Sequence, residues 1–414
     1  MKISCSSKIF TTRRLLNHEI NHDEKADFML NVIFWIVLAF SSIYFVSLII
    51  YVIGLRYSFH PKKINRPFVS VVIAAKNEEQ HIDRLLDSLA EQDYSADRYE
   101  IIIVDNESED KSLAILKEAE QQNPNLKILS TRGIVSDFTL KKAAMNLGIE
   151  NAKGEIILTT DADCELQSGW ISSMAGCFDE EVGMVAGYGR FQYNRRIFHR
   201  LQALDYLMLM TAECATLNLN LVWGCAGNCL AFRKSLFRDV GGYKDIRDRI
   251  GGDDSLFMQI IKKKSSLKIV FNFDPRSVVR TQPVDTLFDL IRQRARWAAD
   301  ANYMVHLNIP FFVVIVSTFI ANLAPIAYLI GWLTGIVGIA PLGILVTLKL
   351  IGEGLVAWRG TRLFRQTELC RLFIPWFLVQ PFYVAVMGIL SFWGNRMDWN
   401  RKRTPLDLMK QDEH

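Results

Sequence analysis

Residues 28–55 contain no charged side chain, and a helix of these 28 residues is longer than the roughly 20 residues that cross about 30 Å of hydrocarbon. The preceding residues 1–27 are mixed in charge, and the apolar run is longer than that of a cleaved signal peptide. We therefore expect an N-terminal tail over 1–27 and an uncleaved transmembrane helix over 28–55. In a chain anchored in this way, one part folds within the lipid bilayer and another part folds in water.

Three more apolar segments lie towards the C-terminus. Residues 307–348 carry no charge over about twice the length of one crossing, and two glycines and a proline near the middle offer breaking points. We expect transmembrane helices over 309–332 and 337–357, and a further one over 373–394, which contains two prolines. Half of the 414 residues are hydrophobic, as expected for a chain that lies partly in a bilayer. Four crossings are the expected number.

Two charged residues, Lys349 and Glu353, stand four apart in this region. On one face of a helix they could pair and reduce the cost of about 2.5 to 3.5 kcal/mol that a lone charge has at mid-membrane. The alternative is that this end of the helix lies at the membrane interface.

Basic residues beside the apolar segments indicate the orientation. They form three clusters: Arg56, Lys62, Lys63 and Arg66; Arg292, Arg294 and Arg296; and Arg359, Arg362, Arg365 and Arg371. Basic residues near membrane helices are enriched on the cytoplasmic side, which is the positive-inside rule. With four crossings all three clusters fall on the cytoplasmic side of a cell inner membrane, and the third cluster lies in a basic loop over 358–372. The C-terminal tail, 395–414, then lies outside despite Arg401, Lys402 and Arg403. Either the last segment is re-entrant or the upstream charges prevail.

A cytoplasmic domain that behaves like a soluble protein is expected over 56–308. The chain has seven cysteines without paired spacing, which fits a reduced cytoplasmic compartment and not a zinc site, so Cys225 and Cys229 are expected to be small buried residues. Residues 204–223 are apolar and would form either an acceptor-facing or interfacial helix or part of the core. Residues 285–303 mix apolar and basic side chains, as in a helix on a membrane surface.

The first part of this domain alternates strand and helix patterns. Apolar strands are expected over 69–75, 101–104, 126–129 and 155–159, and helices between them over 79–90, 111–121 and 141–150. Strands that are apolar on both faces and alternate with helices indicate an α/β fold with a mainly parallel sheet covered by helices. In such sheets ligands bind beyond the carboxyl ends of the strands.

Three of these strands end in polar residues: Asn77 and Glu78 after the first, Asp105 after the second, and Asp161 and Asp163 after the fourth. Carboxylates that crowd together repel one another unless a cation lies between them. Mg²⁺ or Mn²⁺, completed by phosphate oxygens of a substrate, would remove that repulsion. Taken alone, the last pair could equally be a turn, since aspartate is common in turns. The neighbouring aspartate at the end of the second strand favours a site for a nucleotide diphosphate and a metal.

An ordered set of motifs runs over residues 68–300: VSVVIAAKNEE, IIIVDNES, LKKAAMNLGI, TTDADC, GCAGNCLAFRKSLF with GGY, GGDDSLF and QRARW. Their succession resembles that of the family 2 inverting glycosyltransferases, in the membrane-embedded branch that includes cellulose, hyaluronan and poly-N-acetylglucosamine synthases and ceramide glucosyltransferases. The resemblance implies a GT-A fold, a nucleotide-sugar donor that is usually a UDP-sugar, and a divalent metal.

The resemblance also implies a role for particular residues. The donor would be bound by Asn77, Glu78, Asp105, Lys141 and Asp161, and the metal by Asp161 and Asp163. The general base would be Asp254. The acceptor or the diphosphate would lie near Gly227, Asn228, Asp253, Gln293, Arg296 and Trp297.

Each of the last roles has a physical reason and an alternative. A carboxylate that takes the proton of an acceptor hydroxyl contributes typically about 10²- to 10⁴-fold to the rate, but Asp254 could also be only the N-cap of a helix over 255–262, as could Asp253. Arg296 could bind phosphate and Trp297 could stack on a sugar, or both could form an interfacial belt together with Arg294.

These observations predict a membrane-bound inverting glycosyltransferase that acts on a polysaccharide or lipid acceptor. The alternatives are a nucleotidyltransferase, which does not explain the QRARW motif, and a non-catalytic membrane scaffold for sugar binding or transport. The residues after QRARW are Ala-Ala-Asp where the family often has glycine, and no gating loop is evident, so the resemblance supports processive extension less than it supports sugar transfer itself. No nucleic acid partner is expected, and an oligomer or an accessory subunit stays open.

Overall fold

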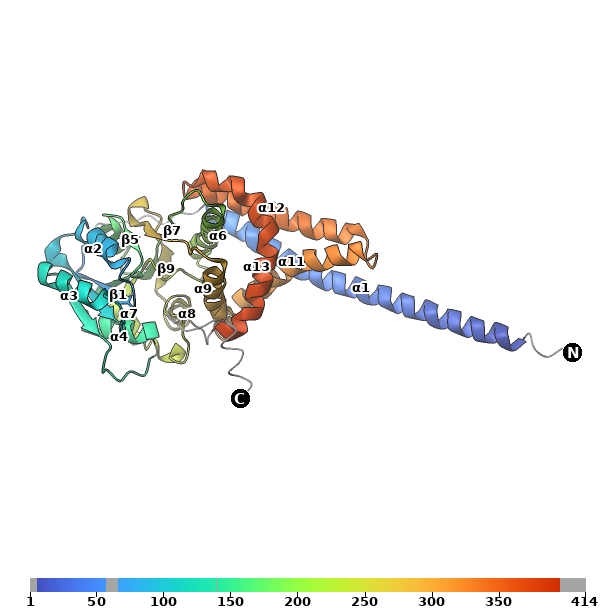
Figure 1. Ribbon diagram of the computed structural model, residues 1–414, viewed down its shortest axis with the longest axis horizontal. Coiled ribbons are helices and arrows are strands. Elements are labelled where there is room, and N and C mark those ends of the chain that lie inside the picture. Colours follow the sequence, from blue (N-terminus) through green and yellow to red (C-terminus); the bar gives the residue numbers. More distant parts are fainter. Residues whose placement is uncertain (1–5, 57–65, 139, 395–414) are drawn as a thin grey trace.

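The computed structural model describes residues 6–56, 66–138 and 140–394. An α/β domain lies at one end of the molecule, and long apolar helices extend from its other side (Figure 1). The predicted fold class is therefore confirmed.

The centre of the α/β domain is a seven-stranded sheet in the order β3-β2-β1-β4-β8-β6-β9. Its first four strands, which were all predicted, are parallel, whereas β8 is antiparallel to both of its neighbours and β9 is parallel to β6. A smaller sheet has the order β5-β10-β7. The bounds are β1 (Val69–Ala75), β2 (Tyr99–Asp105), β3 (Leu126–Ser130), β4 (Ile156–Thr159), β5 (Glu165–Leu166), β6 (Val182–Ala186), β7 (Gly189–Phe191), β8 (Leu230–Arg233), β9 (Lys268–Phe271) and β10 (Val279–Thr281).

Alternate side chains of the sheet enter two hydrophobic cores. In β1, Val71 and Ile73 pack in one core with Leu85 of α2, and Val72 packs in the other with Met145 of α4. Helices therefore cover both faces, as the doubly apolar strands predict. The helices of this domain are α2 (Ile82–Ala90), α3 (Ser112–Gln122), α4 (Leu140–Asn151), α5 (Trp170–Ala175), α6 (Ile197–Asn218), α7 (Lys234–Asp239), α8 (Ser255–Lys264), α9 (Leu287–Ala299) and α10 (Met304–Leu307).

Four helical segments of the described chain are long and apolar enough to cross a membrane: 27–54 in α1 (Ser6–Gly54), α11 (Ile309–Leu333), α12 (Ile339–Leu363) and 367–392, which includes η5 (Thr367–Leu372) and α13 (Phe373–Gly394). α1 begins within the expected N-terminal tail, because no glycine or proline interrupts the residues before 28.

The expected basic loop over 358–372 differs from the structure. α12 continues through Arg359 and Arg362 to Leu363, and η5 follows it. Gly360 lies inside α12 where α6 packs closely against it: a Cβ there would lie 2.3 Å from the Thr211 hydroxyl oxygen, so the glycine serves the packing of the two helices. Basic side chains in the last turn also interact favourably with the helix dipole.

The charged residues of α12 are paired inside the bundle. Lys349 Nζ lies 2.7 Å from Glu353 Oε2 and 2.8 Å from Gln380 Oε1 of α13, while the Tyr44 hydroxyl of α1 donates to Glu353 Oε1 at 2.7 Å. Both charged side chains are buried. The predicted pair therefore exists, and it joins three of the apolar helices.

The helix α13 runs in a different direction from the other three. α1, α11 and α12 extend together away from the α/β domain, whereas α13 runs across them and beside α9 (Figure 1). Met387 packs against Ala295, and Asn302 Nδ2 donates to Ser391 Oγ at 3.1 Å. Large apolar side chains of α13, such as Leu378 and Phe382, remain exposed.

Candidate active site

The loops after β1 and β2 hold each other in place at the carboxyl edge of the sheet. Asp105, the last residue of β2, is fully buried, and its carboxylate accepts from Ser108 N at 3.2 Å and Ser130 Oγ at 3.3 Å. Asn77 has a left-handed backbone (φ 56°), and its Oδ1 accepts from Glu109 N at 2.8 Å. Of the donor residues expected here, Glu78 lines the cavity described next, whereas Asn77 and Asp105 shape the loops beside it.

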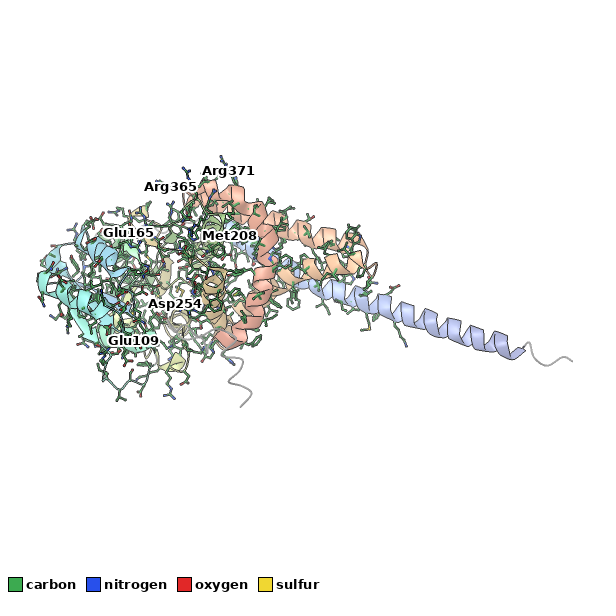
Figure 2. All side chains as sticks on the ribbon, in the orientation of Figure 1. Glu109, Glu165, Met208, Asp254, Arg365 and Arg371 are labelled. Carbon is green, nitrogen blue, oxygen red and sulfur yellow. The ribbon has the colours of Figure 1, made fainter. Side chains whose placement is uncertain are left out.

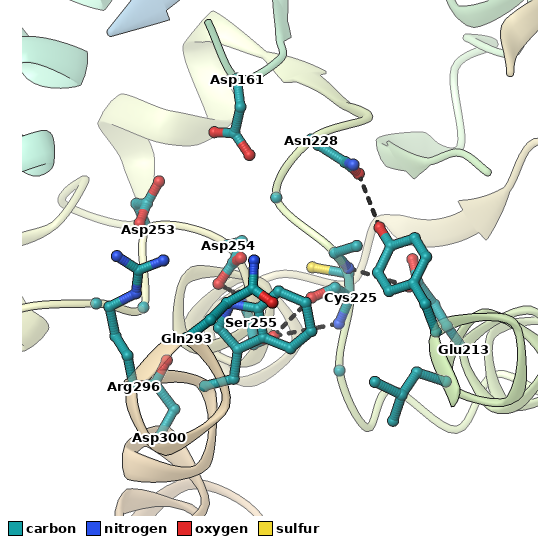
Figure 3. A pocket seen from close by; sticks show the side chains of 18 of the residues that line it. Asp161, Glu213, Cys225, Asn228, Asp253, Asp254, Ser255, Gln293, Arg296 and Asp300 are labelled. Carbon is teal, nitrogen blue, oxygen red and sulfur yellow. Dashed lines mark hydrogen bonds between the residues drawn. The ribbon is translucent and has the colours of Figure 1, made fainter. Parts of the chain in front are cut away.

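A cavity of about 670 Å³ lies between the sheet edge, α6, α9 and the start of α11. Figure 2 shows Asp254 in the part of the α/β domain next to α9, and Figure 3 shows the cavity from close by. The predicted site residues among its lining are Glu78, Lys141, Asp161, Asp163, Gly227, Asn228, Asp253, Asp254, Gln293, Arg296 and Trp297. The fold thus brings together motifs that are far apart in the sequence.

The aspartates that follow β4 form a candidate metal centre. Ligand atoms of Asp161, Asp163 and Cys164 all lie within 4.8 Å of one another. Burial and the charge of Asp161 raise the pKa of Asp163 to about 6, as expected for two carboxylates that share a site. Burial also raises the pKa of the Cys164 thiol, and Mg²⁺ and Mn²⁺ prefer oxygen ligands, so the two carboxylates are the groups that fit such an ion.

A lysine bridges the two acidic motifs. Lys141 Nζ lies 2.7 Å from Asp161 Oδ1 and 2.9 Å from Asp253 Oδ2. Burial acts to lower the pKa of Lys141, but the charges of Asp161 and Asp253 raise it well above its usual value. In return, Lys141 holds the pKa of Asp253 below its usual range against the effect of burial. This ammonium group is therefore a fixed positive charge at the edge of the cavity.

The two aspartates of the GGDD motif have different roles. Gly252 has φ +87°, so the turn requires glycine, and Lys142 Nζ donates to the Gly251 carbonyl oxygen at 3.0 Å. Asp254, and not Asp253, is the N-cap of α8, because its Oδ1 accepts from Ser255 N. Its other oxygen, Oδ2, faces Gly227, where a Cβ would lie only 2.7 Å away.

Asp254 has the environment of a general base. Burial and the charges of Asp253 and Asp300 raise its pKa to about 7. A base whose pKa lies near the operating pH combines a useful ionised fraction with a real affinity for the proton. The N-cap role and the predicted role as base are compatible. Oδ1 caps α8, whereas Oδ2 takes no part in the cap, and the residue lines the cavity.

Helix α9 divides the QRARW motif between two faces. Gln293, Arg296 and Trp297 line the cavity, whereas Arg294 is buried on the other side. The Arg294 guanidinium lies 3.1 Å from Asp205 Oδ2 of α6 and stacks on the Trp297 ring at 4.1 Å from its centroid. Arg294 therefore does not belong to an interfacial belt, since its charge is paired within the protein.

Several cavity residues were not predicted as site residues. Glu213 of α6 and Asp300 after α9 are both acidic and buried or nearly so, and Tyr51 and Phe311 come from the apolar helices. Glu213 and Asp205 are the only charged residues in the apolar run 204–223. Their isolation in this run is the feature of the sequence that could have identified Glu213. α6 packs against the sheets and against α1 and α12, and one of its faces lines the cavity, so it is a core helix that also borders the candidate site. Of the two cysteines expected to be buried, Cys229 is buried and Cys225 is partly exposed.

The pKa of Asp254 leads to a prediction for the pH dependence. A general base must be ionised to take a proton, so we expect kcat/KM to fall about tenfold per pH unit as the pH decreases below about 7, and to level off above it. Initial rates between about pH 5.5 and 8.5 at low substrate would measure this. A profile that is flat across this range would contradict the assignment.

The strand-end aspartates, the bridging lysine and the Asp254 carboxylate lie together at the carboxyl edge of the sheet, as the motif resemblance to glycosyltransferases with a GT-A fold implies. The comparisons with known proteins agree. Residues 70–241 match the model of glycosyl transferase family 2, and residues 156–386, more than half of the chain, match that of glycosyl transferase family group 2. The chain belongs to the family 2 glycosyltransferases. This membership supports glycosyl transfer over the nucleotidyltransferase alternative.

Individual relatives are similar over part of their length. The beta-monoglucosyldiacylglycerol synthase of Synechocystis sp. is 37% identical over 251 residues, which are 58% of this chain and 49% of the relative. That of Trichormus variabilis is 28% identical over 244 residues, 58% of this chain and 50% of the relative. The chain spans about half the length of these curated relatives.

Among solved structures, a mannosyltransferase of Pyrobaculum calidifontis in complex with GDP-Man and Mn²⁺ has a TM-score of 0.58 and 19% identity, and the match covers 87% of this chain and 99% of that one. At this identity the likeness shows the fold.

Proposed function

We propose that this protein transfers a sugar from a nucleotide-sugar, most simply a UDP-sugar, to a hydroxyl group of a membrane lipid, with inversion at the anomeric carbon. The observation that carries this proposal is the extent of the cavity. It runs from Asp161 and Asp254 to Tyr51 of α1 and Phe311 and Ile315 of α11, two of the helices that are apolar enough to cross a membrane. A lipid acceptor needs such a passage, because its reacting group must meet a water-soluble donor without leaving the bilayer.

The proposed reaction is a single displacement. The oxygen of the acceptor hydroxyl attacks the anomeric carbon, Asp254 Oδ2 takes the hydroxyl proton, and the bond between the anomeric carbon and the diphosphate oxygen breaks on the opposite face. The nucleoside diphosphate leaves with the electron pair of that bond. One displacement from the back inverts the configuration at the anomeric carbon.

The negative charge of the leaving group needs positive partners. Lys141 already lies between Asp161 and Asp253, and Arg296, which is partly buried, lines the same cavity. A divalent ion held by Asp161 and Asp163 would add charge stabilisation at the diphosphate. Trp297 has a flat face in the cavity on which a sugar ring can stack.

The lipid acceptor is preferred to a polysaccharide for two reasons. The far end of the cavity is lined by aromatic and aliphatic side chains, such as Trp223, Phe311 and Ile315, which suit acyl chains better than a hydrated glycan. Two of the relatives are named for the synthesis of monoglucosyldiacylglycerol, a glycolipid.

A transfer assay tests the proposed function. The purified protein in lipid nanodiscs would be given UDP-glucose, UDP-galactose, UDP-N-acetylglucosamine or GDP-mannose, with Mg²⁺ or Mn²⁺ and with dioleoylglycerol, ceramide or a polyprenyl phosphate. Mass spectrometry should find one sugar added to a lipid, and NMR should find the anomeric configuration opposite to that of the donor. A ladder of products would indicate a polysaccharide synthase instead. Nucleotide release no greater than that of an Asp254→Asn control would favour the non-catalytic scaffold.

For the orientation, we propose that α1, α11 and α12 cross the bilayer and that α13 lies along the cytoplasmic surface beside α9. The direction of α13 and its packing against Ala295 support this (Figure 1). With three crossings, the basic residues Arg401, Lys402 and Arg403 are on the same side as the catalytic domain. The conflict with the positive-inside rule that four crossings create is then absent.

Reporter fusions distinguish the two orientations. In a bacterial host, green fluorescent protein fused after residue 414 should fluoresce and alkaline phosphatase at the same position should be inactive. Fusions after Ile336, between α11 and α12, should show the reverse and serve as the control. An active phosphatase after residue 414 would support four crossings.

A further inference from the structure

Helix α6 carries a buried carboxyl group in the part of the cavity that leads to the apolar helices. Glu213 is 6% exposed and lines the cavity together with Leu209, Met210 and Thr216 of the same helix. Residues 206–223 contain no other charged side chain. An acidic residue in an otherwise apolar run costs stability unless its polar atoms have partners.

Only one of the two carboxyl oxygens of Glu213 has such a partner. Oε2 accepts a hydrogen bond from Ala226 N at 3.0 Å. Oε1 is buried and has no hydrogen-bond partner among the residues that the structure describes. Leaving a buried polar atom unpaired costs about 1 to 3 kcal/mol. A ligand group that forms a hydrogen bond with this oxygen would therefore recover that free energy.

The same residue is connected to the general base. Ala226 precedes Gly227, the residue that lies against Asp254 Oδ2. Figure 3 shows Glu213 next to Cys225, on the far side of Asp254 from Arg296 and the donor end of the cavity. Burial and the charge of Asp254 raise the pKa of Glu213 well above its usual value, which favours the protonated carboxyl group, with one O–H to donate.

Three aromatic side chains line the same cavity as Glu213 and contact one another. Trp223 stacks on Phe311 with ring centroids 5.6 Å apart and an interplanar angle of 9°, and Tyr51 meets Trp223 edge to face at 5.8 Å. All three side chains line the cavity. A molecule that enters along these rings and reaches Asp254 is therefore apolar at one end and polar at the other.

We propose that Glu213 binds the head group of an uncharged lipid alcohol through a hydrogen bond between Oε1 and the oxygen of the reacting hydroxyl, and so orients the proton of that hydroxyl towards Asp254. This rests on the proposed function and narrows its acceptor class. A lipid phosphate fits poorly, because its charge would lie near Asp254, Asp253 and Asp300, which are acidic groups that line the same cavity. Glu213 is thus a positioning and specificity residue, distinct from the base.

Two substitutions separate recognition from folding. Glu213→Gln keeps the size of the side chain and both hydrogen-bonding functions, whereas Glu213→Leu removes them. With dioleoylglycerol as acceptor, we expect Glu213→Leu to raise the acceptor KM about tenfold, the loss of one hydrogen bond of about 1.4 kcal/mol. Glu213→Gln should stay within about threefold of the wild type. The donor KM should be unchanged in both variants.

A binding measurement makes the test independent of turnover. The dioleoyl ester of 1,2-propanediol has the same acyl chains as dioleoylglycerol but lacks the hydroxyl. The wild type should bind dioleoylglycerol about tenfold more tightly than this ester, and Glu213→Leu should bind the two equally. Equal binding by the wild type, a donor KM that rises as much as the acceptor KM, or transfer to a polyprenyl phosphate in preference to the alcohol would each overturn the proposal. A wild type that prefers the alcohol but transfers no sugar would contradict the proposed function alone.

Discussion

Asparagine in place of Asp254 is expected to lower kcat by about 10²- to 10⁴-fold, the usual contribution of a positioned general base. The amide cannot take the proton of the acceptor hydroxyl. The shape of the site should be kept, because asparagine Oδ1 can still accept from Ser255 N and cap α8. Binding of the nucleoside diphosphate should therefore be retained. Single-turnover rates together with calorimetric titration of UDP would measure both quantities.

The matched control is Asp300→Asn. Asp300 is a second carboxylate of the same cavity, and burial likewise raises its pKa, to about 6. It lies 3.7 Å from the Arg249 guanidinium and does not cap α8, so we expect its replacement to cost at most about tenfold. Equal losses in the two variants would show that Asp254 has no special role.

Stability gives a second check on the Asp254 variant. A carboxyl whose pKa is raised in the folded state is more costly to ionise there than in the unfolded chain, so it destabilises the fold as the pH rises from about 4 to about 7. Asparagine has no such cost. The variant should consequently melt at the same or a higher temperature than the wild type at about pH 8, and a lower melting temperature would indicate that the loss of activity comes from misfolding.

The strands β1 to β4, and the place of the aspartates at their carboxyl ends, could be predicted because local sequence determines them. The strand over 69–75 was predicted at its observed bounds, since a short run of branched apolar residues ends at a polar loop. Asp161 and Asp163 were predicted together because the strand before them fixes their place at the sheet edge. The sequence left the N-cap of α8 open between Asp253 and Asp254, and the structure shows that Asp253 pairs with Lys141 whereas Asp254 caps the helix.

The acceptor end could not be predicted because it depends on contacts between distant segments. Glu213 gains its role from the loop over 224–228, and Tyr51 and Phe311 come from helices whose apolar sequences indicate only lipid. Arg294 illustrates the same limit. Arginine beside tryptophan is typical of a membrane interface, but Asp205, 89 positions earlier in the chain, pairs with this arginine inside the protein. The direction of α13 likewise depends on packing against α9 and not on its own hydropathy.

Removal of the divalent ion, or Asp163→Asn, is expected to lower kcat/KM by at least about 100-fold. Changes to groups that only orient metal ligands already cost about 10- to 100-fold, and Asp163 is one of only two carboxylates proposed to hold the ion. The matched control is Cys164→Ser, because the Cys164 side chain is in the same cluster but is a buried thiol whose replacement keeps a hydrogen-bond donor near Asp163. That variant should stay within about threefold of the wild type.

The measurement is the rate of transfer after treatment with EDTA, with Mn²⁺ or Mg²⁺ added back, and the concentration of Mn²⁺ that gives half the maximal rate in each variant. Asp163→Asn should raise this concentration, whereas Cys164→Ser should leave it unchanged. Full activity in EDTA would mean that Lys141 and Arg296 alone offset the charge of the leaving diphosphate. In that case the raised pKa of Asp163 would mean that this carboxyl group binds a proton where the metal ion was expected. The proton would then reduce the repulsion between the two carboxylates at the end of β4.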